Sequence, residues 1–421
     1  MPVKELQTLS KKKLYLIITN YPNNGSDSIF VAPEIPELMK WFDITVFCTS
    51  GKRDCTHVRD GIEYFYFDME LTLAKKIKYI FKYFGSGICR KDLKDIIKMQ
   101  NLDKKSNLLG RIRKSIEFYG AAEEFYGFFQ EKIKPSDEEA VYYTFWNDYF
   151  TLSLILHKYK YPNFHIVTRL HGYDLYEYRC RYGRQPFKQI MNAEMERLYF
   201  IAENPKEYYV EKYPELNRDK VKVNRLGVYE ISKKEERFKG KKPLIVSCSN
   251  VIALKRVNLI IEALEKLEEE VCWIHFGDGS QFAEISQMAK ERLEKKRNIE
   301  YKLEGRISNE DIRKFYGNNE IRCFVTTSST EGCPISIMEA MAAGIPVVAT
   351  SVGEIPNMIN GNGILLEQNP KAQNVAEALE KIINCSSKKW EEMSRKSYLL
   401  WKKSYNADLN AAEFAEELNG I

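Results

Sequence analysis

Two glutamates that stand eight positions apart, Glu331 and Glu339, are the most informative pair of chemical groups in this sequence. They lie in the segment 328–359, SSTEGCPISIMEAMAAGIPVVATSVGEIPNMI. The pattern predicts a strand that ends before the segment, a tight turn at Gly332, and a helix with Pro334 in its first turn, where a missing N–H costs nothing. We therefore expect Glu331 before the helix, at the edge of a cleft, and Glu339 one turn inside it.

The N-terminus of this predicted helix is suited to bind an anion. The backbone N–H groups of Ile335 and Ser336 have no partner within the helix, and such groups stabilise a diphosphate. Glu339 follows Ile335 by four residues, so it lies on the same side of the helix as these N–H groups. One carboxylate can then accept hydrogen bonds from a sugar while the other holds a ribose.

Two adjacent cations, Lys255 and Arg256, follow another predicted strand in the sequence SCSNVIALKRVNLIIEALEKL. We expect Lys255 to face the same cleft as Glu331 and to neutralise charge that builds on a departing nucleotide diphosphate. A solvated Lys-Arg pair before a helix is the alternative interpretation.

The elements that position these residues alternate as in a doubly wound α/β fold. Strand, loop, helix and strand within 40 residues near the N-terminus form a βαβ unit, and a second series begins near residue 244. Apolar runs predict strands at 13–20, 44–49, 141–145, 165–170, 244–249, 272–276, 299–303, 322–327 and 345–349. Helical patterns cover 30–41, 71–134, 257–269 and the residues after Pro334.

Two domains follow from this order and from the length of 421 residues, which is too long for one ordinary core. We expect an N-terminal Rossmann-like domain at 1–230 with a basic helical insert at 71–134, a polar linker at 231–243, a C-terminal Rossmann-like domain at 244–400 and a final helix at 401–421. Ligands of such domains bind at the carboxyl ends of the strands. Gly25, after the first strand, would let backbone approach a donor phosphate, or it serves only as a turn residue.

Composition excludes several classes of protein. No run of about eighteen apolar residues predicts a transmembrane helix, and the polar start MPVKELQ is not typical of a secretory signal. The nine cysteines are odd in number and form no CxxC pair, which indicates reduced thiols in a cytoplasmic protein. The five histidines show no metal-ligand spacing. We expect no metal and no other cofactor.

The segment around the two glutamates closely resembles the E-x7-E motif of family 4 glycosyltransferases, of the group 1 type used in bacterial surface polysaccharide assembly. The resemblance implies the GT-B fold, in which two Rossmann-like domains face a central cleft. In that family the first glutamate contacts the donor sugar and the second binds the ribose hydroxyls, and Glu331 and Glu339 match these positions. The family usually has an arginine five residues before the lysine that matches Lys255. Here that position is Asn250, so Arg256 is expected to supply the second cation of the phosphate site.

The sequence RLHGYDLYEYR at 169–179 is a further match, in the N-terminal half. His171 resembles the family histidine that faces the donor sugar, which implies a hydrogen bond to a sugar hydroxyl. Asp174 and Arg179 are expected to contact the acceptor. A histidine in a loop is also commonly structural, and that alternative stays open.

Two loops and the C-terminus complete the resemblance. The sequences GDG at 277–279 and GRIS at 305–308 resemble the loops that border the nucleobase pocket, with Arg306 and Ile307 beneath the base. The final helix at 401–421 resembles the family helix that returns to the N-terminal domain. The match covers the C-terminal half well and is looser across residues 1–230.

The basic excess of the chain is concentrated in residues 71–114, which hold thirteen Lys or Arg and three Asp, whereas the whole chain carries a net charge of +5. Aromatic residues alternate with these lysines. We expect this segment to contact an anionic membrane surface, where each basic residue contributes roughly 1 kcal/mol. A solvated helix face is the alternative. No nucleic-acid-binding module accompanies the charge, so nucleic acid is not expected as a partner.

The sequence therefore predicts a retaining, metal-independent glycosyltransferase at the cytoplasmic face of a membrane. We expect a nucleoside-diphosphate sugar as donor, UDP-sugar first, and a glycan or lipid-linked glycan as acceptor. One alternative is a catalytically silent subunit that binds the sugar nucleotide within a glycan-assembly complex. The other is a nucleotide-sugar epimerase of the same fold.

Overall fold

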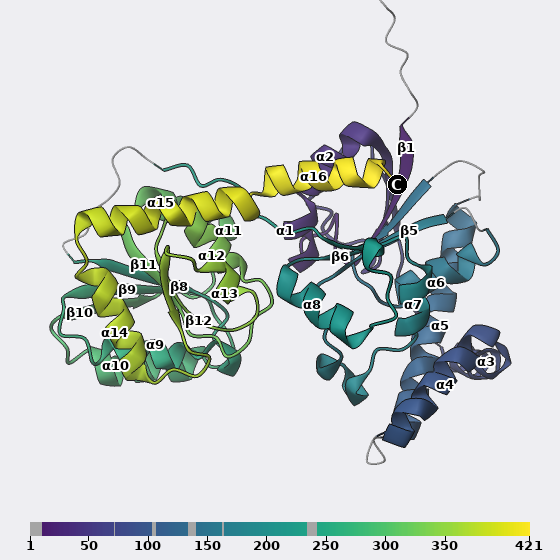
Figure 1. The fold of residues 1–421 in the computed structure, drawn as a ribbon, viewed down its shortest axis with the longest axis horizontal. Helices are drawn as coiled ribbons and strands as arrows, with labels where there is room; N and C mark the ends of the chain where they lie inside the picture. The colour runs from purple at the N-terminus through teal and green to yellow at the C-terminus, as the bar shows by residue number, and fades with distance from the viewer. Residues whose placement is uncertain (1–10, 71, 103–106, 134–139, 162–163, 234–241) are drawn as a thin grey trace, which may run out of the picture. The chain divides into compact units, whose positions relative to one another are not determined.

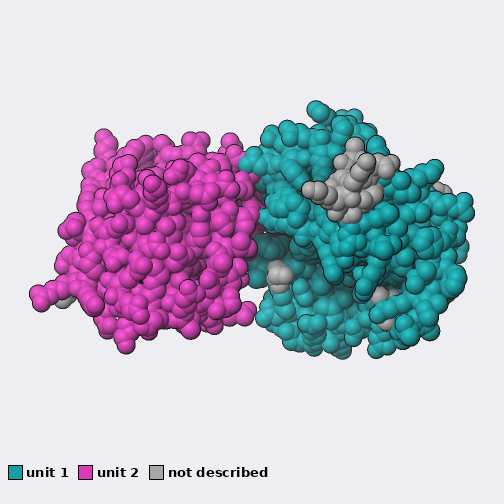
Figure 2. Space-filling view, turned by 90° about the horizontal axis from the view of Figure 1, so that it is seen from below, with its two compact units in different colours: residues 1–224, 411–421 teal, residues 225–410 magenta. Residues whose placement is uncertain are grey.

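The computed structural model describes residues 11–70, 72–102, 107–133, 140–161, 164–233 and 242–421. The chain forms two compact units (Figure 2): unit 1 holds residues 1–224 and 411–421, and unit 2 holds residues 225–410. Unit 1 thus ends at Asn224 and not at the predicted residue 230, because Val228 pairs in parallel with Asn406 inside unit 2. Residues 234–241 of the predicted linker lie outside the described residues.

Unit 1 contains a parallel sheet of seven strands in the order β3-β2-β1-β4-β5-β6-β7. The strands are β1 (Lys12–Ile18), β2 (Phe42–Cys48), β3 (Glu63–Tyr66), β4 (Ala140–Thr144), β5 (Phe164–Leu170), β6 (Arg197–Phe200) and β7 (Val221–Val223). Successive side chains of β1 enter opposite cores, with Tyr15 and Ile17 on one face and Leu14 and Leu16 on the other. The sheet is therefore buried on both faces, as an all-parallel sheet requires.

Helices cover both faces of this sheet (Figure 1). They are α1 (Ser26–Val31), α2 (Glu34–Trp41), α3 (Leu73–Gly85), α4 (Gly87–Leu102), α5 (Leu108–Lys132), α6 (Tyr149–Lys158), α7 (Lys188–Glu194) and α8 (Glu203–Lys212), with 3-10 turns η1 (Glu177–Arg179), η2 (Arg181–Gly183) and η3 (Arg218–Lys220). The helices α3, α4 and α5 confirm the helical insert predicted between residues 71 and 134. A Cβ on Gly120 of α5 would lie 3.1 Å from the ring of Tyr79, so this glycine lets α3 pack closely on α5.

Unit 2 contains a parallel sheet of six strands in the order β10-β9-β8-β11-β12-β13. The strands are β8 (Leu244–Cys248), β9 (Val271–Phe276), β10 (Ile299–Leu303), β11 (Ile321–Thr326), β12 (Val347–Thr350) and β13 (Gly363–Leu366). The helices are α9 (Val257–Leu264), α10 (Phe282–Leu293), α11 (Asn309–Asn318), α12 (Ile335–Ala342), α13 (Ile355–Met358), α14 (Ala372–Ile383) and α15 (Ser387–Ser404), and the 3-10 turn η4 (Ala253–Lys255) follows β8. Ile245 and Val246 enter cores on opposite faces, so this sheet is also covered on both sides.

The predicted final helix is two helices, because α15 ends at Ser404 and α16 (Ala407–Asn419) begins three residues later. The break is fixed by Val228, whose backbone accepts from Ala407 N at 3.1 Å and donates to Tyr405 O at 2.9 Å. From Ala411 onward α16 belongs to unit 1, where Phe414 and Leu418 pack in a core with α2. No helix in the described ranges is long and apolar enough to span a membrane.

Candidate active site

The candidate site of unit 2 lies at the carboxyl ends of β8 and β11. The chain leaves β8 toward β9 on one side, whereas β11 lies on the other side of β8, so the strand order reverses between β8 and β11. Ligands of open parallel sheets bind in the crevice at such a reversal. Because the two strands are neighbours, the loop with η4 after β8 and the loop 327–334 after β11 meet there.

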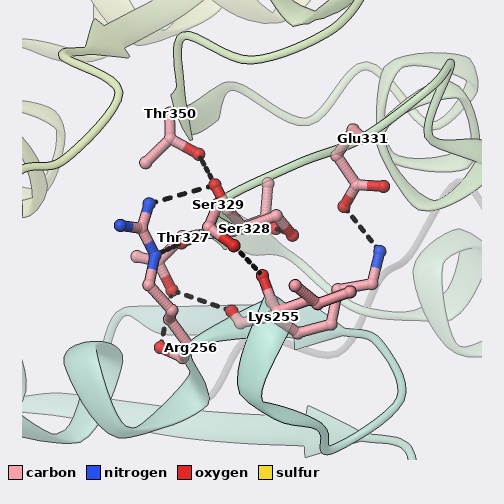
Figure 3. Close-up of polar contacts among 9 residues, drawn as sticks. Lys255, Arg256, Thr327, Ser328, Ser329, Glu331 and Thr350 are labelled. Atoms are coloured by element: carbon pink, nitrogen blue, oxygen red, sulfur yellow. Dashed lines mark hydrogen bonds and ion pairs between the residues drawn. The ribbon is translucent and has the colours of Figure 1, made fainter. Parts of the chain in front are cut away.

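Hydrogen bonds fasten these two loops to each other (Figure 3). Ser329 N donates to Leu254 O at 2.8 Å, and Thr327 Oγ1 donates to Arg256 O at 2.9 Å. Thr350 Oγ1, at the end of β12, donates to Ser328 O at 2.6 Å. The loops therefore form one braced structure, which holds side chains in place before a ligand binds.

Lys255 and Glu331, predicted from separate motifs, form an ion pair in which Nζ lies 2.6 Å from Oε1 (Figure 3). Their side chains are 22% and 11% exposed, so the pair is largely shielded from water. An ammonium group has three donors, so Lys255 can bind an anion while it holds the carboxylate. The structure thus brings together the two residues that were expected to contact a diphosphate and a sugar.

Arg256 occupies a different position from the phosphate contact that we predicted. It adopts left-handed backbone geometry, with φ of 48°, at the start of α9. Its guanidinium donates to Thr327 O at 2.6 Å, Ser328 O at 3.0 Å and Gln368 O at 2.8 Å, and to Asn369 Oδ1 at 3.0 Å. Four of the five N–H donors are thereby taken up, so in this structure Arg256 braces the loops.

The N-terminus of α12 carries the predicted free N–H groups. The helix begins at Ile335 without a side-chain cap, and the first backbone bonds run from Ile337 and Met338 to Pro334 O. Among the described residues, the N–H groups of Ile335 and Ser336 have no hydrogen-bond partner. They are therefore available to an anion.

A glycine supports the turn that precedes this helix. Gly353 has φ of +57°, and a Cβ on it would lie 2.4 Å from Glu331 O. The backbone of the next residue, Glu354, donates to Gly332 O at 2.9 Å. The segment 353–354 thus packs against the backbone of Glu331 and Gly332 and fixes it through this hydrogen bond.

Glu339 is buried one turn inside α12, with 4% of the residue exposed. Burial raises the pKa of its carboxyl to about 7, and the nearby Arg313 charge offsets part of that effect. Burial raises the pKa values of Cys248 and Tyr316, and the charge of Glu339 contributes to both shifts. Among the described residues, Ala343 N donates to the backbone carbonyl of Glu339 at 3.1 Å, but none forms a hydrogen bond to its carboxyl, which is therefore available to ligand hydroxyl groups.

A cavity of about 520 Å³ lies at the carboxyl ends of β8, β9 and β10. The predicted donor-binding residues Asn250, Arg306 and Ile307 all line it. Gly277 belongs to its wall, where a Cβ would lie only 1.9 Å from Ser249 O, so only glycine fits. The volume falls within the usual range for small-molecule sites.

In unit 1, the predicted residue His171 directly follows β5. Its ring stacks on Phe145 at 4.4 Å between ring centroids, and it packs at a tilt against Trp146 at 4.6 Å. Burial and the charge of Arg169 lower the pKa of His171 well below its usual value, so the imidazole is neutral. Both ring nitrogens are buried, and neither has a hydrogen-bond partner in the described part of the chain.

Two other predicted residues of unit 1, Asp174 and Arg179, differ in their exposure. Asp174 is fully buried and accepts from the backbone N–H groups of His171 and Gly172, each at 2.9 Å, and of Asn147 at 3.1 Å. Asp174 thus shapes the His171 loop, and its contact with an acceptor stays a prediction. Arg179 is exposed and its guanidinium lies 4.9 Å from the Tyr176 ring centre.

Gly25 precedes α1 in extended backbone geometry, with φ of 177°. A Cβ there would lie 2.6 Å from Asn20 Cβ, so the absence of a side chain permits this close packing. The predicted approach of this backbone to a donor phosphate stays a prediction.

Sequence reasoning missed two residues beside His171. Asn147 is fully buried, and neither atom of its amide has a partner within the described ranges. Asp148 caps α6 through Phe150 N at 2.9 Å and accepts from Tyr173 OH at 2.9 Å, and burial raises its pKa to about 7. The available signal was an Asn-Asp pair just after an apolar strand, at the edge where ligands bind.

Two Rossmann-like units, one with a braced anion site at its strand reversal, define the GT-B class of fold. Residues 228–399 match the glycosyl transferases group 1 family. The match lies within unit 2.

The curated relatives match over part of their length. A teichuronic acid biosynthesis glycosyltransferase of Bacillus subtilis is 29% identical over 136 residues, which cover 32% of each chain. One component of the human phosphatidylinositol N-acetylglucosaminyltransferase is 30% identical over 142 residues, covering 33% of this chain and 28% of that protein. The chain thus spans about a third of the length of these relatives.

Solved structures match nearly the whole chain. Anabaena HepE is 13% identical with a TM-score of 0.62, covering 98% of this chain and 100% of that one. A glycosyltransferase from Rickettsia africae is 14% identical with a TM-score of 0.65, covering 98% and 99%. These similarities concern the fold, which is GT-B.

Proposed function

We propose that this chain is a retaining, metal-independent glycosyltransferase. Its donor would be a nucleoside-diphosphate sugar, and its acceptor a glycan or lipid-linked glycan in polysaccharide biosynthesis. The observation that carries the proposal is the Lys255–Glu331 ion pair, braced beside the free N–H groups of Ile335 and Ser336. It combines a positive site for a diphosphate with a carboxylate for sugar hydroxyls.

Each group then has a role in transfer. Lys255 and the N–H groups of α12 stabilise the charge that develops on the departing diphosphate. Glu331 accepts hydrogen bonds from the sugar, and Glu339 accepts them from the ribose. His171, a neutral imidazole without an internal partner, donates to or accepts from a sugar hydroxyl. Because protein groups supply the positive charge, the transfer proceeds without a metal ion.

The donor we would test first is a UDP-sugar. HepE, which has a similar fold, was crystallised with UDP-glucose. Among the relatives, the Bacillus subtilis protein acts in teichuronic acid biosynthesis and an Escherichia coli protein in O-antigen biosynthesis, which supports a polysaccharide acceptor.

The test is a donor panel in EDTA. Purified protein is mixed with UDP-, GDP- and ADP-sugars, and nucleotide release is followed beside Glu331→Ala and beside Glu270→Ala, an exposed glutamate without a role in the site. Release from one donor that is lost in Glu331→Ala and kept in Glu270→Ala supports the proposal. Release that requires an added divalent ion contradicts metal independence. Anomeric retention is read from the product by NMR.

One observation favours a second candidate, the catalytically silent subunit. Asn250 stands where a cation was expected, and Arg256 is taken up by backbone carbonyls, so Lys255 is the cation best placed for the diphosphate. Tight binding of UDP without release of nucleotide from any donor, with or without lipid-linked acceptors, would favour this candidate.

We further propose that α3 places the enzyme on the cytoplasmic face of an anionic membrane. Leu73, Ile77, Phe81 and Phe84 are 74%, 49%, 76% and 52% exposed, and their spacing puts them on one side of the helix. Lysines alternate with them. Phe81→Asp should reduce co-sedimentation with vesicles that contain phosphatidylglycerol, whereas Trp41→Asp, at an exposed site outside the insert, should not.

A further inference from the structure

A groove of about 750 Å³ lies between α3 and α5 in unit 1, and none of the candidate active-site residues lines it. Apolar side chains make up most of its lining, among them Met69, Ile80, Leu109, Ile112, Ile116 and Ala121. Met69, Ile80 and Leu109 are 36%, 41% and 79% exposed. The groove is thus open and apolar, and its volume fits a small molecule.

The two sides of the contact between α3 and α5 differ in the residues that line them. On the opposite side of Tyr79, a second hollow is lined by charged residues, and the ion pairs Lys75–Glu124 and Lys82–Glu123 tie α3 to α5 there. Exposed apolar surface is therefore confined to one side of this contact. Contiguous exposed apolar surface rimmed by polar residues is typical of interaction sites and ligand-binding grooves.

The charged residues around the apolar groove are mostly basic. Lys76, Arg113 and Lys114 line it with a single carboxylate, Glu117, and Arg113 is paired with Glu117 at 2.9 Å. Lys76 and Lys114 have no carboxylate partner among the described residues. An occupant with a hydrocarbon body and an anionic group would therefore match the groove.

Two of the lining residues indicate which anionic, hydrocarbon-containing molecule the groove binds. Ile80, which lines the groove, lies on α3 between Ile77 and Phe84, two residues of the exposed apolar face proposed to contact the membrane. Tyr149, which also lines the groove, begins α6 and directly follows Asp148, the N-cap residue of that helix. Asp148 adjoins Asn147, whose buried amide has no partner in the described part of the chain.

We propose that this groove binds the hydrocarbon chain of a lipid-phosphate-linked acceptor, a proposal that rests on the glycosyltransferase function above. The chain would enter from the membrane beside Ile80, and its phosphate would lie near Lys76 and Lys114. The groove thereby directs the attached glycan toward Asn147 and His171, at the carboxyl edge of β4 and β5. The acceptor is then lipid-linked and not a free glycan.

Dodecyl phosphate, below its micelle concentration, is a simple probe for this site. Calorimetric titration should detect binding to the wild-type chain, and butyl phosphate should bind at least about tenfold more weakly because its chain buries little apolar surface. Ile112→Asp, in the groove on α5, should weaken dodecyl phosphate at least about tenfold. Phe81→Asp, exposed on α3 outside the groove, is the matched control and should bind like wild type. Leu109→Asp repeats the test at a 79% exposed site where folding is not at risk.

Two further measurements separate the lipid-linked acceptor from a bilayer lipid and from failure of the proposed function. Dodecyl phosphate should inhibit transfer to a lipid-linked acceptor while donor hydrolysis without acceptor continues. Vesicle binding should fall in Phe81→Asp and persist in Leu109→Asp. Equal binding of dodecyl phosphate by wild type, Ile112→Asp and Leu109→Asp overturns the inference, as does loss of vesicle binding in Leu109→Asp. The binding arms need no donor, so they remain decisive for a catalytically silent protein.

Discussion

The two strand edges that carry the candidate residues differ in how their polar groups are satisfied. In unit 2, Lys255 is paired with Glu331, and Arg256 is bound to carbonyl oxygens of three loop residues. In unit 1, the buried amide of Asn147 and both ring nitrogens of His171 have no partner among the described residues. An unpaired buried polar group costs roughly 1–3 kcal/mol. The charges of Lys255 and Arg256 in unit 2 are therefore satisfied internally, whereas Asn147 and His171 in unit 1 retain polar atoms whose hydrogen bonds a ligand would complete.

Because of this difference, we expect substitutions in the two units to affect stability and activity in different ways. In unit 2, substitutions of Lys255 and Arg256 should disturb both, since these side chains also hold the loops. In unit 1 the substitutions should affect ligand handling and leave the fold intact.

The largest effect is expected for Lys255→Ala. It removes the cation nearest the proposed diphosphate and leaves Glu331 largely buried without its partner. Nucleotide release should fall by about 100- to 1,000-fold, the range seen when one charge-stabilising donor is removed from an active site. Lys266→Ala, at an exposed site just beyond α9, is the control. Release that stays within about threefold of wild type would show that the ion pair is only structural.

Arg256→Gly tests the difference between bracing and phosphate binding. Glycine tolerates the left-handed backbone at this position, so the substitution removes the guanidinium without new strain. Loss of its hydrogen bonds should lower the free energy of unfolding by about 1–3 kcal/mol and slow nucleotide release by about tenfold. Urea unfolding and the release assay measure the two quantities. A large loss of release with unchanged unfolding would instead restore the predicted phosphate contact.

Glu339→Gln should remove a pH dependence centred near pH 7. The pKa of Glu339 is raised from its usual 4.5 to about 7, so the ionised carboxylate, the better acceptor for ribose hydroxyls, forms as the pH rises from 6 to 8. The donor KM should therefore fall over this range by about three- to tenfold in wild type and stay flat in the glutamine variant.

The stability of unit 2 should change in the opposite direction. A carboxyl whose folded pKa is raised contributes stability that is complete below its unfolded pKa and is lost as the pH rises through the folded pKa. Wild type should therefore become less stable to urea between pH 5 and pH 8, and Glu339→Gln should not. A parallel decline in both proteins would assign the effect to other groups.

The parts of unit 2 that the sequence predicted are those encoded locally. Apolar strands that end in glycine or serine turns placed Lys255, Glu331 and Glu339 at one edge of a parallel sheet, and the structure agrees. The bracing by Arg256 was not predictable, because its partner Gln368 is 112 positions away and offers only a backbone carbonyl. Contacts to backbone leave no signature in the partner's residue type.

Unit 1 was harder to predict for a different reason. The strands β3, β6 and β7, and β13 of unit 2, went unrecognised; each has only three or four residues, too few to show a period. The equally short β12 was predicted because it lies in the segment 328–359 that carries the two glutamates. Asn147 was missed because a buried amide without partners contradicts the usual rule for cores, and that rule fails most often at ligand sites.

The smallest effect on the fold is expected for His171→Phe, which tests whether the unpaired ring nitrogens of unit 1 serve a ligand. A phenyl ring can keep the stacking on Phe145 and the packing against Trp146 while removing two buried nitrogens that have no partner in the described ranges. The free energy of unfolding should therefore stay within about 1 kcal/mol of wild type or rise, because an unpaired polar group is lost. Nucleotide release should still fall by roughly tenfold, since the sugar loses one hydrogen bond. If the substitution instead destabilised unit 1 and left release unchanged, His171 would be a packing residue, and Asn147 would be the remaining group at this edge whose polar atoms await a ligand.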